Sequence, residues 1–492
     1  MLILIYLFIL FLLQHIRFVA LTNILQNQFY SFQRFLLYQK NQKRNIVFKT
    51  IYLLIVTCLC FINTFYCLFL PLVFIEIIQN KIKKFQWTNR VKRQFIVFEF
   101  LNIAIFLFLL VNHENIQFIF LPFLYSFAIY WLSFVISIFI EKIIQRKYLK
   151  LAKEKLIKYN VTFIAITGSY GKTSCKNYIY ELLKDKYNVL QTPKSFNTLN
   201  GIIMTINSQL KPYHDIFIAE IGVDKKNGMN KYIKNFNIDY GIVTKIGNQH
   251  IKTFKTIENI KNEKVKILNA ATKCAFINFD DNLIDETNIK CNKCYFSTKD
   301  ENADICVTLN KQEIDKTNLK IKIKNNFYNS YTTLLGKHNL ENLACAISVA
   351  KKLNVDDDII ISKIKKLHNS THRLSTVIKN RWTILDDSYN SNFVGFLNAL
   401  DVLKQSTNLR VIITPGLIEQ IKNEQQDEII ANKIKECCDL IILINNPSFQ
   451  NKIANKLVFS SFLEAYNYLT INYGDKDITL LIENDLPDIF LK

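Results

Sequence analysis

The stretch that decides the fold is VTFIAI followed by TGSYGKTS, which together run from Val161 to Ser174. The first six residues are mostly apolar or β-branched, which predicts a buried β-strand. The residues that follow predict a tight glycine turn into a helix, where backbone N–H groups and the positive end of the helix dipole face one point. Such a turn suits a polyphosphate, with the Lys172 ammonium on the β- and γ-phosphates and the Thr173 hydroxyl on Mg²⁺.

The loop is a shortened form of the usual phosphate-binding pattern G-x-x-x-x-G-K-[ST], because Ile166 stands where the first glycine is expected. For this stretch taken alone, the alternative is a strand-turn-helix corner in which glycine serves only the turn. The nucleotide hypothesis assigns contacts with ATP to six residues of the loop: Gly168, Ser169, Gly171, Lys172, Thr173 and Ser174.

The 492-residue chain is long enough for two or three domains, and its apolar residues are unevenly distributed. Residues 50–75 and 118–140 carry no charge, and as helices each would cross about 30 Å of hydrocarbon, so we expect both to span a membrane. Residues 94–112, interrupted only by Glu99, are an expected third span, and residues 1–22 are a candidate fourth. A buried soluble helix is the alternative for each segment.

Positive charge gathers in the same part of the chain. The net charge is +21, and up to Lys158 there are 19 Lys plus Arg against 5 Asp plus Glu. Basic stretches at 81–93 and 142–150 flank the apolar segments, which by the positive-inside rule places them and everything after residue 140 in the cytoplasm. The basic segment 34–49 fits this topology poorly and leaves the number of spans open. This charge pattern predicts membrane lipid as a partner, and no nucleic acid.

After Lys158, short apolar runs alternate with helical stretches, which predicts a mainly parallel sheet with helices on both faces. We expect strands at 161–167, 187–192, 216–221, 240–246 and 274–278, and a second series at 382–385, 411–414 and 440–444. The predicted fold class is therefore α/β in three parts: an N-terminal helical transmembrane segment (1–150), a central P-loop parallel-sheet ATPase domain (151–370) and a C-terminal Rossmann-like α/β domain (371–492).

Polar side chains follow two of these strands, and ligands of open α/β sheets bind at the carboxyl ends of strands. Glu220 ends the strand in IFIAEIG, and His250 follows the next strand in GNQH. Either alone is more often a surface or capping residue, but together they could hold Mg²⁺ near the phosphate loop. Lys264 lies in the expected helix 257–268, and its composition predicts a solvated lysine.

In their order along the chain, these motifs resemble the Mur ligase family, and within it the MurF-type branch that adds D-alanyl-D-alanine to UDP-N-acetylmuramoyl tripeptide. The likeness runs from about Val161 to the C-terminus, and AEIG and DDSYNSN favour the MurF-type branch. The matching motifs are TGSYGKTS, SFNTLNG around Asn197, AEIGVDKKNGMN with Glu220, IGNQH with His250, GKHNLEN from Gly336, HRL from His372 and DDSYNSN from Asp386.

The resemblance implies an ATP-dependent amide ligase of peptidoglycan precursor synthesis at the inner membrane of a bacterium. ATP would convert the peptide carboxylate into an acyl phosphate, which the amine of D-Ala-D-Ala would then attack. ATP and Mg²⁺ are the implied cofactors, and UDP-muramoyl peptide and D-Ala-D-Ala are the implied substrates.

The resemblance also implies roles for individual residues. Catalytic roles fall to Lys172, Glu220, His250 and Lys264. The metal ligands would be Thr173, Glu220, His250 and Lys264, the last after carbamoylation. The remaining nucleotide contacts would be His338, Asn339, Asn342, Arg373 and Asp387, and the substrate contacts Asn197, Thr198, Asn390 and Asn392.

The chain departs from the family pattern at three places. Lys245 stands where Asn is usual, Phe393 stands where Pro commonly follows the Asn-rich loop, and a membrane segment occupies the place of the domain that grips UDP. One alternative is another Mur-like amide ligase, such as a membrane-associated poly-γ-glutamate synthase. A nucleotide-regulated transporter or scaffold is the alternative of another class, although the expected spans hold almost no ionisable group except Glu99.

Overall fold

The computed structural model describes residues 14–15, 18–27, 30, 85–111, 121–281, 284–369, 372–388, 392–417, 424–444 and 447–483. The chain forms two compact units, Met1–Lys147 and Tyr148–Lys492. The expected span at 50–75 and much of the one at 1–22 lie outside the described residues.

The described part of the first unit is helical. It contains α4 (Asn89–Val111) and the start of α5 (Leu121–Lys158), packed around Phe18, Phe98 and Tyr130. Many apolar side chains nevertheless remain exposed, among them Ile96, Phe100, Val111, Phe139 and Ile143. Among the described residues, Ala128–Lys158 is long and apolar enough to cross a membrane, a criterion of length and composition only.

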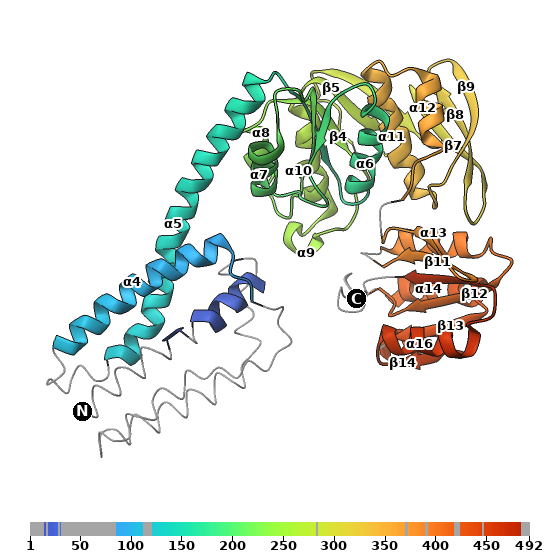
Figure 1. Cartoon of the computed structure of the whole chain (residues 1–492). Coiled ribbons are helices and arrows are strands. Elements are labelled where there is room, and N and C mark those ends of the chain that lie inside the picture. The colour runs from blue at the N-terminus through green and yellow to red at the C-terminus, as the bar shows by residue number, and fades with distance from the viewer. Residues whose placement is uncertain are drawn as a thin grey trace. The chain divides into compact units, whose positions relative to one another are not determined.

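A nine-stranded sheet dominates the second unit, in the order β2-β3-β1-β4-β5-β6-β7-β8-β9 (Figure 1). The first seven strands along the chain run parallel, and the seventh continues into an antiparallel meander with the last two. Their bounds are β1 (Thr162–Thr167), β2 (Val189–Gln191), β3 (Ile216–Glu220), β4 (Ile238–Val243), β5 (Ala271–Asn278), β6 (Asn292–Ser297), β7 (Ile305–Gln312), β8 (Thr317–Ile323) and β9 (Asn326–Thr332).

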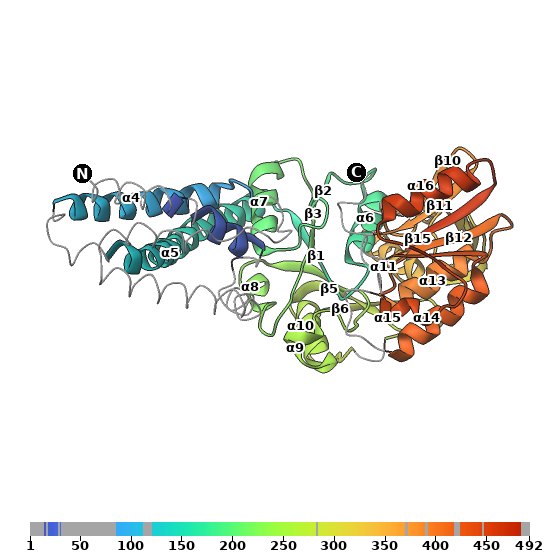
Figure 2. The ribbon, with the colours of Figure 1, turned by 90° about the horizontal axis from the view of Figure 1, so that it is seen from below.

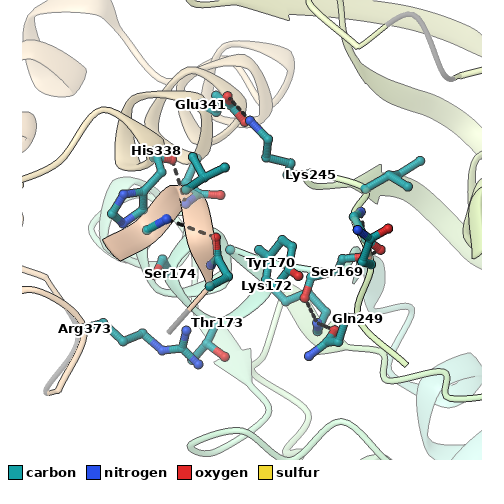
Figure 3. A pocket seen from close by; sticks show the side chains of 18 of the residues that line it. Ser169, Tyr170, Lys172, Thr173, Ser174, Lys245, Gln249, His338, Glu341 and Arg373 are labelled. Carbon is teal, nitrogen blue, oxygen red and sulfur yellow. Dashed lines mark hydrogen bonds and ion pairs between the residues drawn. The ribbon is translucent and has the colours of Figure 1, made fainter. Parts of the chain in front are cut away.

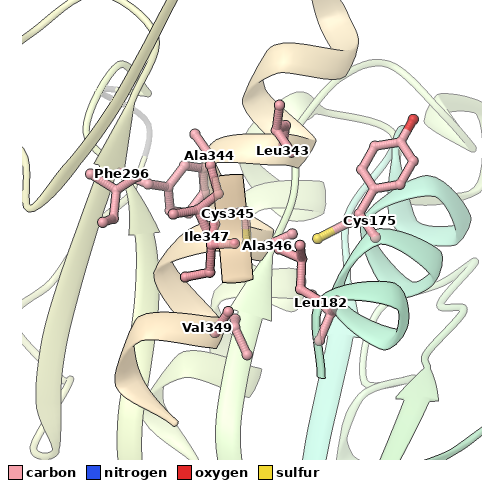
Figure 4. Packing of buried hydrophobic residues seen from close by; sticks show 14 of the residues in the cluster. Cys175, Leu182, Phe296, Leu343, Ala344, Cys345, Ala346, Ile347 and Val349 are labelled. Carbon is pink, nitrogen blue, oxygen red and sulfur yellow. The ribbon is translucent and has the colours of Figure 1, made fainter. Parts of the chain in front are cut away.

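Helices cover both faces of this sheet, as the sequence predicts. Figure 2 shows α6 and α11 on one side of β1 and β3, and α7 and α8 on the other. The two faces bury separate hydrophobic clusters, and in the first of these α11 packs its Leu343, Cys345 and Ala346 near Cys175 and Leu182 of α6 (Figure 4). The helices are α6 (Lys172–Leu183), α7 (Leu199–Gln209), α8 (Asn230–Ile233), α9 (Ile251–Phe254), α10 (Ile257–Asn269), α11 (His338–Lys352) and α12 (Asp357–Ile364).

A second, six-stranded sheet follows, in the order β10-β11-β15-β12-β13-β14, with only the β10 edge antiparallel. Its two faces bury separate clusters against helices. The elements are β10 (Ser375–Lys379), β11 (Trp382–Asp387), α13 (Phe393–Leu403), β12 (Leu409–Thr414), α14 (Glu424–Cys437), β13 (Leu440–Ile444), α15 (Pro447–Gln450), β14 (Leu457–Phe459), α16 (Phe462–Tyr473) and β15 (Ile478–Glu483).

The α/β prediction is confirmed, and each predicted strand coincides with an observed one. The prediction missed β6 to β9 and the edge strands β10 and β14, as well as β15. In β8, buried residues alternate with half-buried Asn and Lys, and in β9 half-buried or buried residues alternate with exposed Phe327, Asn329 and Tyr331. This is the pattern of antiparallel strands with one solvated face. The runs that were recognised are instead apolar on both faces, as central parallel strands require.

Candidate functional site

The loop between β1 and α6 has the backbone that a phosphate-binding turn needs. Gly168 and Gly171 have φ angles of 154° and 81°. A Cβ atom on Gly168 would lie 1.8 Å from Thr244 Oγ1, and one on Gly171 would lie 2.3 Å from Asn342 Oδ1. No side chain caps the first turn of α6, so its free N–H groups remain available to an anion.

Lys172 folds back over this loop. Its Nζ donates to the carbonyl oxygens of Gly168 at 2.9 Å and Ser169 at 3.1 Å, and to Gln249 Oε1 at 3.4 Å. Burial lowers the pKa of Lys172 to about 8, while Glu220 raises it and Arg373 lowers it further. An anion in the loop would therefore stabilise the charged form of this ammonium.

The carboxylate of Glu220 lies beside the start of α6. The Thr173 hydroxyl donates to Glu220 Oε2 at 2.8 Å, and Asn197 Nδ2 donates to Oε1 at 3.3 Å. Lys176 Nζ lies 3.9 Å from the same carboxylate. The β1–β3 register pairs Ile166 with Glu220, which brings this side chain to the same edge of the sheet as the loop.

The Glu220 and Thr173 oxygens fit Mg²⁺, which takes hard oxygen ligands. Within the described ranges, no group of three or more His, Cys, Asp and Glu side chains could hold a metal ion. Mg²⁺ is usually held by one or two carboxylates together with phosphate oxygens and water.

Lys264 of α10 is buried, with 2% of its surface exposed, so the solvated lysine expected from composition is wrong. Its Nζ donates to Gly168 O at 2.7 Å, the carbonyl that Lys172 also contacts. Burial lowers the pKa of Lys264 to about 7; Lys172 lowers it further, and the neighbouring Glu263 raises it. Near neutral pH this amine therefore exists partly in its neutral, nucleophilic form.

A cavity of about 370 Å³ joins the phosphate loop to the second sheet. Its wall includes the loop, residues 245–249, the first turn of α11 and residues that flank β10 and α13 (Figure 3). The predicted site residues that line it are Ser169, Gly171, Lys172, Thr173, Ser174, Asn197, Glu220, His338, Asn342, Arg373, Asp387 and Asn392.

Several predicted residues do not line this cavity. His250 is exposed at the start of α9 and is not among the residues that line the cavity. Thr198 caps α7 by accepting from Gly201 N, and Asn339 donates to Leu335 O and accepts from the Tyr178 hydroxyl. Both residues therefore make contacts that support the fold. Gly168 and Lys264 lie next to the lining residues through the contacts above, and Asn390 lies outside the described residues.

The part of the cavity wall outside the phosphate loop contains ionisable groups that the loop motif alone does not predict. Burial lowers the pKa of His338 to about 4, and Arg373 and Lys245 lower it further, so its ring is neutral at physiological pH. Lys245, at the position where the chain departs from the family pattern, forms an ion pair of 2.9 Å with Glu341.

Gln249 also lines the cavity, and it directly precedes His250 in GNQH. Sequence reasoning chose the histidine of this motif and missed the glutamine.

Residues 166–350 match the family model of the Mur ligase middle domain. The UDP-N-acetylmuramoyl-tripeptide--D-alanyl-D-alanine ligase of Buchnera aphidicola subsp. Baizongia pistaciae is 26% identical over 281 residues, which cover 56% of this chain and 61% of that enzyme. The enzyme of the same name from Borreliella burgdorferi is 25% identical over 344 residues, covering 67% of this chain and 70% of its own.

The solved structure of MurF ligase from Thermotoga maritima in complex with ADP superposes with a TM-score of 0.62 and 22% identity. The match covers 69% of this chain and 80% of that chain. At this level of identity the likeness establishes a shared fold. The chain spans less than two thirds of the length of several of the curated relatives that it matches.

Proposed function

Because the chain belongs to the Mur ligase family, whose middle domain it carries at residues 166–350, we propose that it is a MurF-type ATP-dependent amide ligase. It would join D-alanyl-D-alanine to UDP-N-acetylmuramoyl tripeptide in peptidoglycan precursor synthesis. The observation that carries the proposal is the cavity in which the phosphate loop, Glu220 with Thr173, and Arg373 with Asp387 meet.

In this reaction the protein mainly positions the reacting groups and stabilises the negative charge of the phosphates. A carboxylate is a poor electrophile, so ATP would first phosphorylate it, and the amine would then displace phosphate from the acyl phosphate. Lys172 would stabilise the phosphate charge that grows during the transfer. Mg²⁺ held by Thr173 and Glu220 would neutralise phosphate oxygens.

The remaining lining residues fit the other ligands of this reaction. Arg373, which precedes β10, and Asp387, the last residue of β11, would contact the nucleotide from the side opposite the loop. Asn197 and Asn392 would offer amide groups to the peptide substrates. Asn390 belongs to the same Asn-rich loop as Asn392. Keeping water out of this cavity would protect the acyl phosphate from hydrolysis.

The identity of the amine donor tests the proposal most simply. The purified full-length protein receives Mg²⁺·ATP and UDP-muramoyl tripeptide with D-Ala-D-Ala, D-alanine or glutamate, and the products are identified by mass spectrometry. We expect the pentapeptide product with the dipeptide only. Incorporation of glutamate would instead support a ligase of the poly-γ-glutamate synthase type.

We also propose that Lys264 becomes carbamoylated and so supplies a carboxylate toward the metal. Only a neutral amine reacts with carbon dioxide, and the pKa of about 7 leaves Lys264 mostly neutral above neutral pH and mostly charged below it. Added bicarbonate should therefore stimulate the enzyme above about pH 7 and have little effect in acid. Labelled bicarbonate should give a carbamate signal by ¹³C NMR that Lys264→Ala lacks.

Lys264→Ala should also lose activity by about 10²-fold, and a small carboxylic acid such as acetate should restore part of it. Lys261→Ala is the matched control, because Lys261 lies on the same helix and forms an ion pair of 3.6 Å with Glu258. An active Lys264→Ala variant, or a wild-type protein without a carbamate signal at alkaline pH, would contradict the proposed carbamoylation of Lys264.

We further propose that the first unit anchors the protein in a bacterial inner membrane, with the second unit in the cytoplasm and lipid as its partner. The exposed apolar residues of α4 and α5 support this, as do the basic residues that follow residue 140. The full-length protein should stay in the membrane fraction after washing with alkaline carbonate, which releases peripheral proteins. Release into the supernatant would contradict the anchor.

A further inference from the structure

Two carboxyl groups meet at the ends of neighbouring strands of the second sheet. Asp387 is the last residue of β11 and Glu483 the last residue of β15, and the parallel register sets them directly opposite each other. Both are buried, with 9% and 0% of their surfaces exposed. Asp387 lines the cavity that contains the phosphate loop, whereas Glu483 is not among its lining residues.

A hydrogen bond between two carboxyl groups needs at least one proton. The Glu483 side chain forms a hydrogen bond with the Asp387 side chain, and the backbone of Leu374 forms another with Asp387. The pair therefore carries at most one negative charge in this state. A second ionised carboxylate in so buried a place would be strongly unfavourable, because burial and the neighbouring negative charge both disfavour its ionised form.

The charged groups around Asp387 act in opposite directions. Burial is the largest effect and raises the pKa of Asp387 to about 7, and Asp386 on the same strand also raises it. Arg373, which precedes β10, lowers it, and Asp386 is itself held by His372 at 2.7 Å. The first turn of α13 adds no charge, because Phe393, Val394 and Gly395 are uncharged. Near neutral pH, Asp387 is therefore poised to gain a proton.

We propose that Asp387 takes up a proton when a nucleoside triphosphate binds, and that Glu483 is the positioning residue that keeps Asp387 able to do so. This inference rests on the ATP binding proposed above. The phosphates would bring negative charge into the cavity, which favours the neutral form of a nearby carboxyl group. They would also attract Arg373, whose charge acts on Lys172 and His338 as well as on Asp387. Both changes favour a neutral Asp387, which can donate a hydrogen bond to a nucleotide oxygen.

The sign of the pH dependence follows from this proton uptake. Raising the pH through 7 ionises Asp387 in the free protein, so ATP binding must then also capture a proton and becomes weaker. Asparagine resembles the neutral acid and has no proton to gain. Asp387→Asn should therefore bind ATP at alkaline pH at least as tightly as the wild type. Glu483→Gln, which keeps a hydrogen-bond donor opposite Asp387, should retain the wild-type pH dependence.

The test is isothermal titration of the full-length protein with a non-hydrolysable ATP analogue and excess Mg²⁺, in buffers that differ in ionisation enthalpy. Between about pH 6.5 and 8.5, the wild type should lose roughly 10-fold more affinity than Asp387→Asn, with the corresponding proton uptake missing in the variant. Lys172 also gains a proton on binding, but it does so in both proteins, so the difference isolates Asp387. Glu428→Gln on the exposed face of α14 is the matched control and should behave as wild type.

The outcomes separate this inference from the proposed function. If Asp387→Asn weakens binding equally at both pH values, Asp387 acts as an ionised acceptor and the inference is overturned. The inference is also overturned if Asp387→Asn keeps the full proton uptake of the wild type. If the folded wild-type protein binds no ATP analogue at either pH, the proposed ligase function fails together with the inference.

Discussion

Replacing Lys172 with alanine is expected to lower the rate of ATP-dependent ligation by about 10³-fold, the loss expected for a group that stabilises charge in the transition state. The Lys172 ammonium lies over the loop between β1 and α6 and is partly desolvated, which lowers its pKa to about 8. Phosphates in the loop would offer it better partners than the two loop carbonyl oxygens it now contacts. The measurement is phosphate release with all substrates saturating.

Two comparisons make this result specific. Lys184→Ala removes a lysine at the other end of the same helix, where it pairs with Glu181, and should leave the rate almost unchanged. The thermal midpoint of Lys172→Ala should equal or exceed that of the wild type, because the variant removes a desolvated charge. If the Lys172→Ala enzyme keeps most of its activity, the loop does not take part in phosphate transfer.

Replacing Glu220 with glutamine is expected to lower the ligation rate by roughly 10²-fold and to raise the Mg²⁺ concentration needed for half-maximal activity. The amide keeps the size of the side chain and one oxygen next to Thr173, but it lacks the charge that attracts the ion. The carboxylate now accepts from Thr173 and Asn197, which fixes the direction of its oxygens. High Mg²⁺ should therefore rescue part of the lost rate.

The control for Glu220→Gln is Glu181→Gln on α6, which removes a half-exposed carboxylate from the same region of the fold. That variant should keep both the rate and the Mg²⁺ requirement of the wild type. If Glu220→Gln loses activity with an unchanged Mg²⁺ requirement, Glu220 supports the loop and a different group binds the metal.

The central part of the fold could be predicted because its strands are buried on both faces. Between their ends, strands such as β1 and β3 carry apolar residues on both faces, so their signal needs no knowledge of their neighbours. The meander of β7, β8 and β9 could not be found in the same way. One face of β8 and β9 is solvated, and the Lys and Asn residues on that face resemble the helix surfaces elsewhere in this Lys- and Asn-rich chain.

The candidate site was predictable where a local motif fixes the geometry. Lys172 and Thr173 follow β1 after the short glycine turn, and Glu220 ends the neighbouring parallel strand, so strand direction brings them to the same edge of the sheet. Lys264 was misjudged from composition because its burial depends on how α10 packs beneath the loop. His250 was expected beside Glu220, but the backbone turns at this residue with a φ of 60° and leaves its side chain exposed.

The pairing of Asp387 with Glu483 illustrates the limit of sequence reasoning. The two residues are 96 positions apart in number and meet only because β15 inserts between β11 and β12 in the second sheet. Neither strand carries a local signal for its partner. Such pairs can be found only when the register of the sheet is known, and only the structure shows that both carboxyl groups are buried.

Phosphate release from ATP by the detergent-purified full-length protein tests the central claim most directly. UDP-muramoyl tripeptide and D-alanyl-D-alanine are supplied together and each alone, with Lys172→Ala as the inactive reference. Our account predicts rapid release only when both substrates are present, with one pentapeptide formed for each phosphate released. Phosphate release that is equally fast without the dipeptide, or that yields no pentapeptide, would contradict it.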